Sequence, residues 1–433
     1  MEGKPLNQTE IKRRGPLKGG ITPPSDKSIS HRAIIISSLA KGKSRIKNFL
    51  RAEDTLRTLE AFKQMGIKII DEDGVIIVNG KGLNGLLEPE NSIECGNSGT
   101  TMRLLSGVLA GQPFEARLTG DSSLQRRPMQ RIIDPLSKMG AEILSEKGEQ
   151  PPLTIMGGNL KPEDLTLPIA SAQVKSAILF AGLYCDGVTS VTGPARSRDH
   201  TERMLRAAGV EVEEIGQKVS VTGIATLKPM DITIPADFSS AAFFIVAGLI
   251  IPGSEILIKN VGINPTRIGL ISILQDMMGN HIELLNVSEI SGEPVADILV
   301  KHSKLKGIDA GSNRILSAID EFPILCVAAA AASGKTKITG AKELRIKESD
   351  RISSMAQELQ KMGAEVKELD DGIIIKGREK LKPATINSHG DHRVAMAMSI
   401  AGLLAEGKTT VKNTDCINTS FPGFFSELEK LME

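Results

Sequence analysis

The chain has 433 residues, of which 40% are hydrophobic and 24% are charged, a composition typical of a soluble globular protein with two or more domains. A formal net charge of +1 gives no indication of a polyanionic partner. One Tyr, 11 Phe and no Trp leave few side chains that could stack on bases, so nucleic-acid binding is not expected.

The cysteines and apolar segments indicate a cytoplasmic protein. The segment 1–20 lacks the apolar core of a signal peptide. The longest apolar run, Ala241–Ile251, is too short to span a bilayer and stops at a proline. The four cysteines lie far apart and form neither a CxxC nor a metal-binding spacing, as expected for reduced thiols: Cys95, Cys185, Cys326 and Cys416. We therefore expect no membrane partner and no metal.

The stretch 25–48 predicts a helix with a polar start and an apolar body. Ser25 or Asp26 can cap the helix, and Lys27 and Arg32 lie in its first turns. A helix start with free N–H groups, a Lys and an Arg is an anion-binding site. The following sequence AIIISSLA is apolar or small on every side, as in a helix that is buried all round. The glycine of KGK then ends the helix, and SRIKN forms a short strand.

The pattern of buried helix, glycine and short strand occurs six times. The copies lie roughly 70 residues apart and begin at Ser30, Gly99, Ala172, Ser239, Phe322 and His392. An amphipathic helix with one or two strands follows most copies, beginning at Asp54, Arg127, Asp199, Ile268 and Ser349. Each unit is therefore expected to run strand, buried helix, strand, surface helix, strands.

Six such units could form one closed assembly or two sets of three. The proline-bearing joint Leu227–Asp237 falls between the third and fourth units, and we place a domain boundary there. The segment GPLKGGIT predicts a strand ahead of the first unit, which we expect to cross back to the C-terminal half.

Polar residues gather just before or at the start of the buried helices, in SDKSISHR, GNSGTTMR, ASAQVKS, PADFSS, AIDEFP and GDHR. If the units pack side by side, these starts bring donors and positive potential to one place. Helix capping alone explains a Ser or Asp in this position. It does not explain cations, which oppose the helix dipole and suggest an anionic ligand: Lys27, Arg32, Arg103 and Arg393.

A second basic set lies in the linking segments LQRRPMQR, GPARSRDH and LRIKESDR. Arginine forks match the paired oxygens of carboxylates and phosphates, and a solvated helix face is the alternative for each segment taken singly. Carboxylates interleave with these cations, and they could provide a general acid or base or form structural ion pairs: Asp320, Glu348, Asp350 and Asp391.

The sequence GLLAEGKT at 402–409 matches the phosphate-loop pattern residue for residue. A phosphate loop needs a strand before it and a helix after it, whereas here a helix precedes and a strand follows. The same position in other units has AKGKSRI and ASGKTKI. We therefore interpret it as the ordinary helix-to-strand turn of the repeat, not as a nucleotide site.

Six motifs, in this order and spacing, resemble the EPSP synthase (3-phosphoshikimate 1-carboxyvinyltransferase) family: SDKSISHRA, GNSGTTMRL, RRPM, ASAQVKSA, KESDR and GDHRVAMA. The resemblance covers essentially the whole chain. It implies the two-domain inside-out α/β fold of enolpyruvyl transferases, with six βαβαββ repeats, three per domain. Domain I would comprise residues 1–22 and 236–433, domain II residues 23–235, and the active site the cleft between them.

The resemblance also implies a reaction, in which the enolpyruvyl group of phosphoenolpyruvate passes to the 5-hydroxyl of shikimate 3-phosphate with release of phosphate. By matching motifs, shikimate 3-phosphate would be bound by Lys27, Ser28, Arg32, Ser171, Ala172, Gln173, Ser197, Asp320 and Lys347. Phosphoenolpyruvate would be bound by Lys27, Asn97, Gly99, Arg127, Gln173, Arg351 and Arg393. The family requires no metal or organic cofactor and is usually monomeric.

The same resemblance implies the catalytic roles. Asp320 would be the base toward the 5-hydroxyl, Glu348 with Lys27 would relay the proton to the methylene carbon, and His392 would assist. Which residue delivers the proton stays open. Because both domains would supply these residues, closure on substrate binding is expected to exclude water.

Three positions depart from the pattern of many members. Thr419 stands where they have a Lys, His200 where they have a Tyr, and Ala172 where they have a Ser. With SDKSISHR and DSSLQRRP, these differences resemble the bacterial subgroup called class II. Gly99, which some herbicide-tolerant members replace with Ala, favours glyphosate sensitivity.

Two other functions remain as alternatives. The sibling enzyme that acts on UDP-N-acetylglucosamine opens with a Lys-Asn pair and carries a reactive Cys or Asp in a loop, whereas here Lys27 precedes Ser28 and DSSLQRRP has no Cys. A non-catalytic scaffold that binds phosphorylated ligands would not need Asp320, Glu348 and His392 beside the basic clusters.

Overall fold

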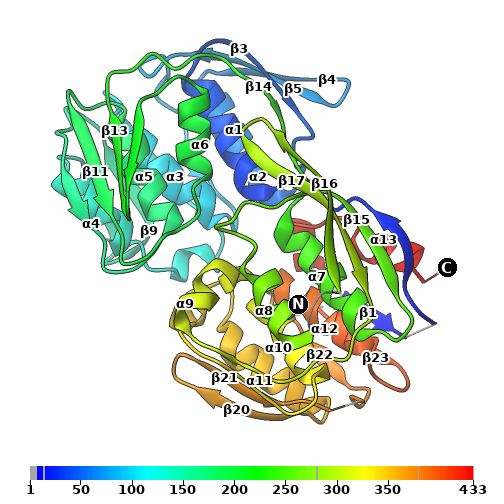
Figure 1. The fold of residues 1–433 in the computed structure, drawn as a ribbon. Coiled ribbons are helices and arrows are strands. Elements are labelled where there is room, and N and C mark those ends of the chain that lie inside the picture. Colours follow the sequence, from blue (N-terminus) through cyan, green and yellow to red (C-terminus); the bar gives the residue numbers. More distant parts are fainter. Residues whose placement is uncertain (1–6, 13–14, 279–280, 379, 433) are drawn as a thin grey trace. The chain divides into compact units, whose positions relative to one another are not determined.

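The computed structural model describes residues 7–12, 15–278, 281–378 and 380–432, which form a mixed α/β protein (Figure 1). The α/β class predicted from the sequence is confirmed. The chain divides into two compact units. Unit 1 comprises Met1–Pro24, Pro235–Ser288 and Pro294–Glu433, and unit 2 comprises Ser25–Ile234 and Glu289–Glu293.

Unit 2 contains three four-stranded sheets, in the orders β14-β3-β5-β4, β6-β7-β9-β8 and β10-β11-β13-β12. Their strands are β3 (Lys41–Lys47), β4 (Lys68–Glu72), β5 (Val75–Lys81), β6 (Ile93–Glu94), β7 (Glu115–Thr119), β8 (Glu142–Lys147), β9 (Gln150–Met156), β10 (Asp164–Thr166), β11 (Val188–Thr192), β12 (Val212–Ile215), β13 (Lys218–Thr222) and β14 (Asp231–Thr233). Because β14 follows the third repeat but pairs in parallel with β3 of the first, the set of three repeats is closed.

The helices of unit 2 are of two kinds, as the sequence predicted. The buried helices are α1 (Lys27–Leu39), α3 (Gly99–Ala110) and α5 (Ala172–Gly182). The amphipathic helices are α2 (Glu53–Gln64), α4 (Gln130–Lys138) and α6 (His200–Ala207), with a short 3-10 turn η1 (Leu124–Arg126) before α4. Every residue of α1 from Ile29 to Leu39 is buried, because small and apolar side chains cover all sides of this helix.

Unit 1 contains the orders β16-β17-β15-β2, β18-β19-β21-β20 and β1-β23-β22. Its strands are β1 (Gln8–Ile11), β2 (Lys18–Ile21), β15 (Glu255–Gly262), β16 (Ile282–Ile290), β17 (Glu293–Lys301), β18 (Asp309–Ala310), β19 (Lys335–Ile338), β20 (Glu365–Leu369), β21 (Gly372–Lys376), β22 (Thr385–Asn387) and β23 (Thr409–Lys412). Its helices are α7 (Phe238–Ile250), α8 (Gly269–Met278), α9 (Ser312–Ile315), α10 (Phe322–Ala331), α11 (Arg351–Lys361), α12 (His392–Gly402) and α13 (Phe424–Lys430), with 3-10 turns η2 (Leu316–Glu321), η3 (Lys342–Ile346) and η4 (Thr414–Thr419).

The N-terminal strands complete two sheets of unit 1. β2 pairs in parallel with β15, and β1 pairs antiparallel with β23. After β23, the sixth repeat continues with η4 and the short helix α13, and the described residues there form no hairpin. β1 takes the place beside β23 that a hairpin strand takes elsewhere. β1 is an element that the sequence analysis did not anticipate.

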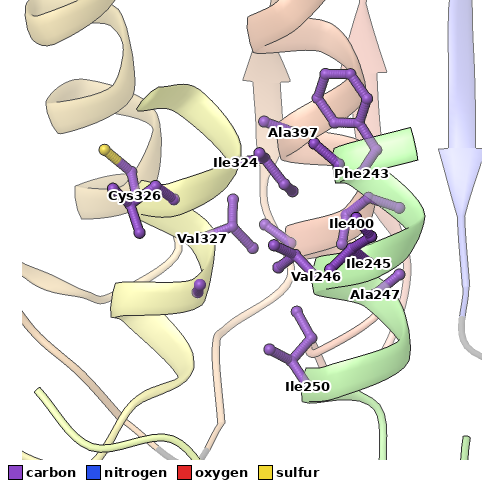
Figure 2. Close-up of a cluster of buried hydrophobic side chains, with 14 of the residues drawn as sticks. Phe243, Ile245, Val246, Ala247, Ile250, Ile324, Cys326, Val327, Ala397 and Ile400 are labelled. Carbon is purple, nitrogen blue, oxygen red and sulfur yellow. The ribbon is translucent and has the colours of Figure 1, made fainter. Parts of the chain in front are cut away.

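The core of unit 1 is built on three buried helices, α7, α10 and α12. All residues of α7 are buried, and apolar side chains of the three helices point toward one another (Figure 2). The facing residues in this view include Val246 and Ile250 of α7, Ile324 and Val327 of α10, and Ala397 and Ile400 of α12. Because the apolar bodies of these helices are buried in the core, functional residues are expected at their polar starts.

Two glycines show how closely the buried helices pack. A Cβ at Gly107 of α3 would lie 2.2 Å from the Ala177 carbonyl oxygen of α5, so only glycine permits this approach. Gly42 was expected to end the first helix, but that expectation was wrong. α1 ends at Leu39, and Gly42 lies inside β3 with φ +135°, where its Cβ would lie 3.2 Å from Pro229.

The phosphate-loop-like sequence at 402–409 lies between a helix and a strand. α12 ends at Gly402 and β23 begins at Thr409, the reverse of the order that a phosphate loop requires. Over the described parts of the chain, none of the helices combines the length and apolarity needed to cross a bilayer.

Candidate active site

The starts of α1, α3 and α5 lie together in unit 2. Arg32 of α1 donates from Nη2 to Ser176 Oγ of α5 over 2.8 Å. Arg103 of α3 donates from Nη1 to Gln173 Oε1 of α5 over 2.8 Å, and Gln173 donates from Nε2 to Thr100 Oγ1 over 2.8 Å. Three helix starts that are far apart in sequence are thus joined by side-chain hydrogen bonds, and their N–H groups and cations favour anions in this region.

Each of these starts has its own cap. The Asp26 carboxylate accepts from the Ile29 N–H over 2.8 Å, which settles the choice that the sequence left between Ser25 and Asp26. The hydroxyls of Ser98 and Ser171 accept from the N–H groups three residues on, in α3 and α5. Because capping is already provided, the cations at the same starts need another explanation.

Arg32 is buried and held in one orientation. Its Nε donates to Thr201 Oγ1 over 2.6 Å, and its Nη1 donates to the Ser28 carbonyl over 3.0 Å. Ser176 and Thr201 are also hydrogen-bonded to each other over 2.7 Å. This bracket of hydroxyls and a carbonyl orients the guanidinium, and neither Thr201 nor Ser176 was identified from the sequence.

Lys27 forms an ion pair with Asp54 of α2, with 3.0 Å between Nζ and Oδ2. Both side chains are largely buried. The sequence indicated Asp54 only as the start of an amphipathic helix. The structure gives it the further role of positioning the ammonium group at the start of α1.

The loop before α3 lies against two arginines. Arg127 donates from Nη2 to Asn97 Oδ1, and Asn97 donates from Nδ2 to Asp121 Oδ2 over 2.8 Å. A Cβ on Gly99 would lie 2.8 Å from Nη1 of Arg103 and 3.1 Å from Nη1 of Arg127. The glycine therefore leaves room for two guanidinium groups beside the start of α3.

Ser171 and Ser197 line a small cavity in unit 2 together with Lys175 and Glu202. The cavity measures about 20 Å³, enough for one water molecule. Ala172 opens α5 beside Ser171. The predicted binding residues of α5 and of the segment after β11 are therefore neighbours.

His200, one of the three positions that depart from the pattern of many family members, is buried at the start of α6. Its Nδ1 is hydrogen-bonded to Glu293 Oε1 over 2.7 Å. Arg203 of the same helix donates from Nη1 to the Gly292 carbonyl over 3.1 Å. These contacts explain why the turn Glu289–Glu293 belongs to unit 2 although β16 and β17 otherwise belong to unit 1.

Arg351 is the centre of the polar cluster in unit 1. It is 1% exposed and contacts three carboxylates: Asp391 over 2.8 Å, Glu348 over 2.6 Å and Asp320 over 3.5 Å. Burial, the largest influence on the pKa of Arg351, acts to lower it, but the three carboxylates raise this pKa above the ordinary value. Arg351 is therefore a fixed charge that holds three carboxylates together.

Arg393 joins the same cluster from α12. Its Nη1 donates to the Asp320 carbonyl over 2.9 Å, and its Nη2 lies 3.5 Å from Asp320 Oδ2. Asp391, the cap of α12, accepts from the Arg393 N–H over 2.8 Å. The starts of α11 and α12 and the 3-10 turn η2 are thus brought together. His392 is buried at the first position of α12, and Lys347 lies next to Glu348 ahead of α11.

A second buried network in unit 1 was missed by the sequence analysis. Arg267 donates from Nη2 to Ser239 Oγ over 2.8 Å and pairs with Asp237, the cap of α7, over 3.2 Å. The Ser239 hydroxyl in turn donates to Glu321. The segments PADFSS and AIDEFP were noted for their polar residues, but Arg267 lies in no motif and gave no signal.

His31 shows how burial affects a titratable group beside the cations. Its pKa is lowered well below the ordinary value, by burial first and then by the charges of Lys27 and Arg32. Its Nδ1 is hydrogen-bonded to Thr58 over 2.7 Å. His31 is therefore a neutral residue of the helix packing rather than a further cation.

The cysteines offer no nucleophile, and all four are free. Burial raises the pKa of Cys416 to about 12 and raises that of Cys95, near the loop before α3, further still. Within the described segments, no group of three or more His, Cys, Asp or Glu side chains could hold a metal ion.

The geometry is that of an α/β protein with cations at buried helix starts in one unit and carboxylates held beside arginines in the other. A family model described as EPSP synthase (3-phosphoshikimate 1-carboxyvinyltransferase) matches residues 11–428. The chain is 53% identical over 98% of its length to the 3-phosphoshikimate 1-carboxyvinyltransferase of Geotalea uraniireducens (strain Rf4), covering 98% of that protein. It is 55% identical to the same-named protein of Thermodesulfovibrio yellowstonii, covering 98% of this chain and 99% of that one.

A solved structure of EPSP synthase from Acinetobacter baumannii has the same fold, with a TM-score of 0.87 and 46% identity over 98% of both chains. The chain belongs to the EPSP synthase (3-phosphoshikimate 1-carboxyvinyltransferase) family. The predicted fold class and family are therefore confirmed.

Proposed function

We propose that the two polar clusters, one in each unit, carry the residues for the reaction of this family. The chain transfers the enolpyruvyl group of phosphoenolpyruvate to the 5-hydroxyl of shikimate 3-phosphate and releases phosphate, a step of the shikimate pathway. Both substrates are anions. The observation that carries the proposal is the set of cations at the starts of α1 and α3, which are joined to the start of α5 and already have caps.

The first half, in unit 2, would bind shikimate 3-phosphate and part of phosphoenolpyruvate. Arg32, with Ser28 beside it, has the fixed guanidinium that paired phosphate or carboxylate oxygens match. The phosphate pocket would be completed by Ser171, Ala172, Gln173 and Ser197. Phosphoenolpyruvate would be bound by Lys27, Asn97, Gly99, Arg127 and Gln173.

The second half, in unit 1, would supply the acid and the base. Attack of the 5-hydroxyl on C2 of phosphoenolpyruvate needs a base for the hydroxyl proton, and we assign Asp320. The methylene carbon must gain a proton to become a methyl group, and we assign Glu348 with Lys27, with His392 assisting. The contacts of Asp320 and Glu348 with Arg351 support both assignments, because the arginine holds each carboxylate in place.

Collapse of the resulting tetrahedral intermediate reverses the protonation of the carbon, and the proton taken from the 5-hydroxyl passes to the departing phosphate. The methyl group loses a proton, the C–O bond to phosphate breaks, and the enolpyruvyl ether remains on the shikimate ring. Arg351 and Arg393, assigned to phosphoenolpyruvate, would offset charge on the departing phosphate, and Lys347 would bind ring hydroxyls.

The proposal also covers the subgroup, the cellular compartment, the oligomeric state and the inhibition of the protein. Ala172, His200 and Thr419, with SDKSISHR and DSSLQRRP, support the class II subgroup. We propose a cytoplasmic monomer that is inhibited by glyphosate and binds neither nucleic acid nor membranes, with the free cysteines supporting the reducing compartment. Light scattering at several protein concentrations tests the monomer.

The decisive experiment measures phosphate release from phosphoenolpyruvate with either shikimate 3-phosphate or UDP-N-acetylglucosamine. We expect release only with shikimate 3-phosphate. Glu348→Gln should reduce kcat by about 100-fold or more, as expected for loss of a proton-transfer group. Glu365→Gln, which alters an exposed surface pair with Lys376 in the same unit, is the matched control and should keep kcat.

The other outcomes are informative in different ways. Release only with the sugar nucleotide would assign the chain to the sibling reaction. Release with neither acceptor, while shikimate 3-phosphate still binds, would indicate a binding scaffold. Unchanged kcat in Glu348→Gln would remove this residue from the proton relay.

A further inference from the structure

An ion pair lies inside unit 2, beneath the proposed phosphate-binding residues. Lys175 of α5 pairs with Glu202 of α6, and the two residues are 8% and 0% exposed. Buried charges are costly, and an apolar pair of similar volume usually serves stability as well. α5 is otherwise apolar or small over most of its length, so the charges call for a role other than packing.

Lys175 has a second partner. Its Nζ donates to the backbone carbonyl of Ser197 over 3.3 Å. Ser197 lies in 193–199, which has neither helix nor strand between β11 and α6. An ammonium group has three donors, so one lysine can satisfy the Glu202 carboxylate and the Ser197 carbonyl together. The pair therefore ties an irregular segment to α5.

The geometry connects this tie to Ser171, the cap of α5. Ser171, Lys175, Ser197 and Glu202 line the same cavity of about 20 Å³. Lys175 lies one helical turn after Ser171, and its N–H donates to the Ser171 carbonyl over 3.0 Å. One helix thus carries one proposed phosphate ligand and the anchor for the other.

Glu202 keeps the anchor in place. Burial acts to raise the pKa of Glu202, and the charge of Lys175 opposes this effect. Without Glu202, the Lys175 ammonium would be left as a buried charge that turns toward solvent or loses its proton, and the Ser197 carbonyl would lose its donor.

We propose that the Lys175–Glu202 pair positions Ser197 relative to Ser171, so that both hydroxyls reach the 3-phosphate of shikimate 3-phosphate. Lys175 and Glu202 are positioning residues and touch neither substrate. This inference rests on the proposed function of Ser171 and Ser197. It predicts that the pair determines how strongly the enzyme favours shikimate 3-phosphate over shikimate, which lacks the phosphate.

The test uses Lys175→Met and the double variant Lys175→Met/Glu202→Leu in the full-length enzyme. The double variant replaces the ion pair by apolar side chains, so its stability should return to that of the parent. The Ser197 carbonyl still lacks its donor, so KM for shikimate 3-phosphate should stay about ten- to 100-fold above the parent value. KM for phosphoenolpyruvate and the affinity for shikimate should change less than about twofold.

A purely structural role predicts the opposite result. The stable double variant would then bind shikimate 3-phosphate as the parent does, which would overturn the proposal. Lys218→Met is the control, because Lys218 also pairs with a carboxylate, Asp164, but at the surface of the same unit. It should leave both affinities unchanged.

Ser197→Ala separates failure of this inference from failure of the proposed function. If Ser197→Ala weakens binding of shikimate 3-phosphate but not of shikimate, and the double variant does not, only the positioning role is refuted. If Ser197→Ala has no effect, the proposed phosphate site is wrong and the inference falls with it. Loss of phosphate preference in both variants supports both.

Discussion

The two polar clusters hold their arginines in different ways. In unit 2, Arg32 rests on the hydroxyls of Ser176 and Thr201, and Arg103 rests on the amide of Gln173. In unit 1, Arg351 contacts the carboxylates of Asp320, Glu348 and Asp391. A hydroxyl or amide orients a guanidinium without cancelling its charge, whereas a carboxylate compensates that charge.

Both clusters contain the same short sequence pattern, so the difference comes from the residues that surround it. A His-Arg pair stands in the first turns of a buried helix in each unit, at 31–32 in α1 and at 392–393 in α12. In α1 this arginine meets neutral oxygens, and in α12 it meets the carbonyl and carboxylate of Asp320. The hydroxyls that orient Arg32 fit the anion-binding role proposed for the unit 2 cluster, and the carboxylates beside Arg351 fit the acid–base role proposed for the unit 1 cluster.

The largest expected effect comes from breaking the unit 1 cluster. Arg351→Met should lower the free energy of unfolding by about 3–5 kcal/mol, because the fully buried Asp391 and the partly buried Asp320 and Glu348 lose their counter-ion. Urea denaturation measures the loss. Arg345→Met is the control, since Arg345 pairs with Asp350 and Glu368 in a more exposed place and should cost no more than about 1 kcal/mol. Equal losses of stability in both variants would show that the buried cluster contributes no more to stability than the exposed pairs of Arg345 do.

A smaller effect is expected from altering the neutral bracket in unit 2. Arg32→Lys keeps the charge but removes the planar fork that reaches Thr201, Ser176 and the Ser28 carbonyl. KM for shikimate 3-phosphate should rise about ten- to 100-fold, with little change in stability. Arg51→Lys, at an exposed pair with Asp71, is the matched control for steady-state kinetics. An unchanged KM would argue that charge alone suffices at this position.

A third prediction concerns how the stability of the protein depends on pH through His31, next to Arg32 in unit 2. The pKa of buried His31 is lowered, so below about pH 6.5 the unfolded chain binds a proton that the folded chain does not. Stability of the parent should therefore fall as pH decreases, by up to about 1.4 kcal/mol per pH unit from this residue. His31→Asn, which can keep the bond to Thr58, should lack this contribution. The stability difference between parent and variant, measured from pH 7.5 to 5, should shift steadily against the parent, and a constant difference would contradict the prediction.

The smallest effect is expected at the glycine beside the unit 2 arginines. In Gly99→Ala, the added methyl would lie within 3.1 Å of the ends of Arg103 and Arg127, which must move. Because these are the ends of flexible side chains, KM for phosphoenolpyruvate should rise by less than about tenfold, with KM for shikimate 3-phosphate unchanged. Gly158→Ala, at a glycine in the same unit with open space around it, is the control. Equal changes in both KM values would indicate a general distortion of the start of α3.

Much of the fold was determined locally by the sequence. The repeat of small apolar helices predicted α1, α7, α10 and the other buried helices, because a stretch that is apolar on all sides has to be enclosed. The helix-then-strand order at 402–409 likewise excluded a phosphate loop, and the structure has that order. The cation-bearing starts were visible because Lys and Arg at a helix start oppose the dipole.

The tertiary structure decided which partners these residues meet. Thr201 and Ser176 are ordinary polar residues in the sequence, and only the packing of α6 and α5 beside α1 makes them the bracket of Arg32. The sequence likewise gave no indication of the contacts of Arg267 or of the hydrogen bond from Lys175 to Ser197. Hydrophobic periodicity and helix capping involve residues that are close together in the chain, so they can be recognised directly from the sequence. The partner of a buried charge is fixed by contacts between segments distant in the chain, so the division into neutral and carboxylate-held arginines appears only when the chain is folded.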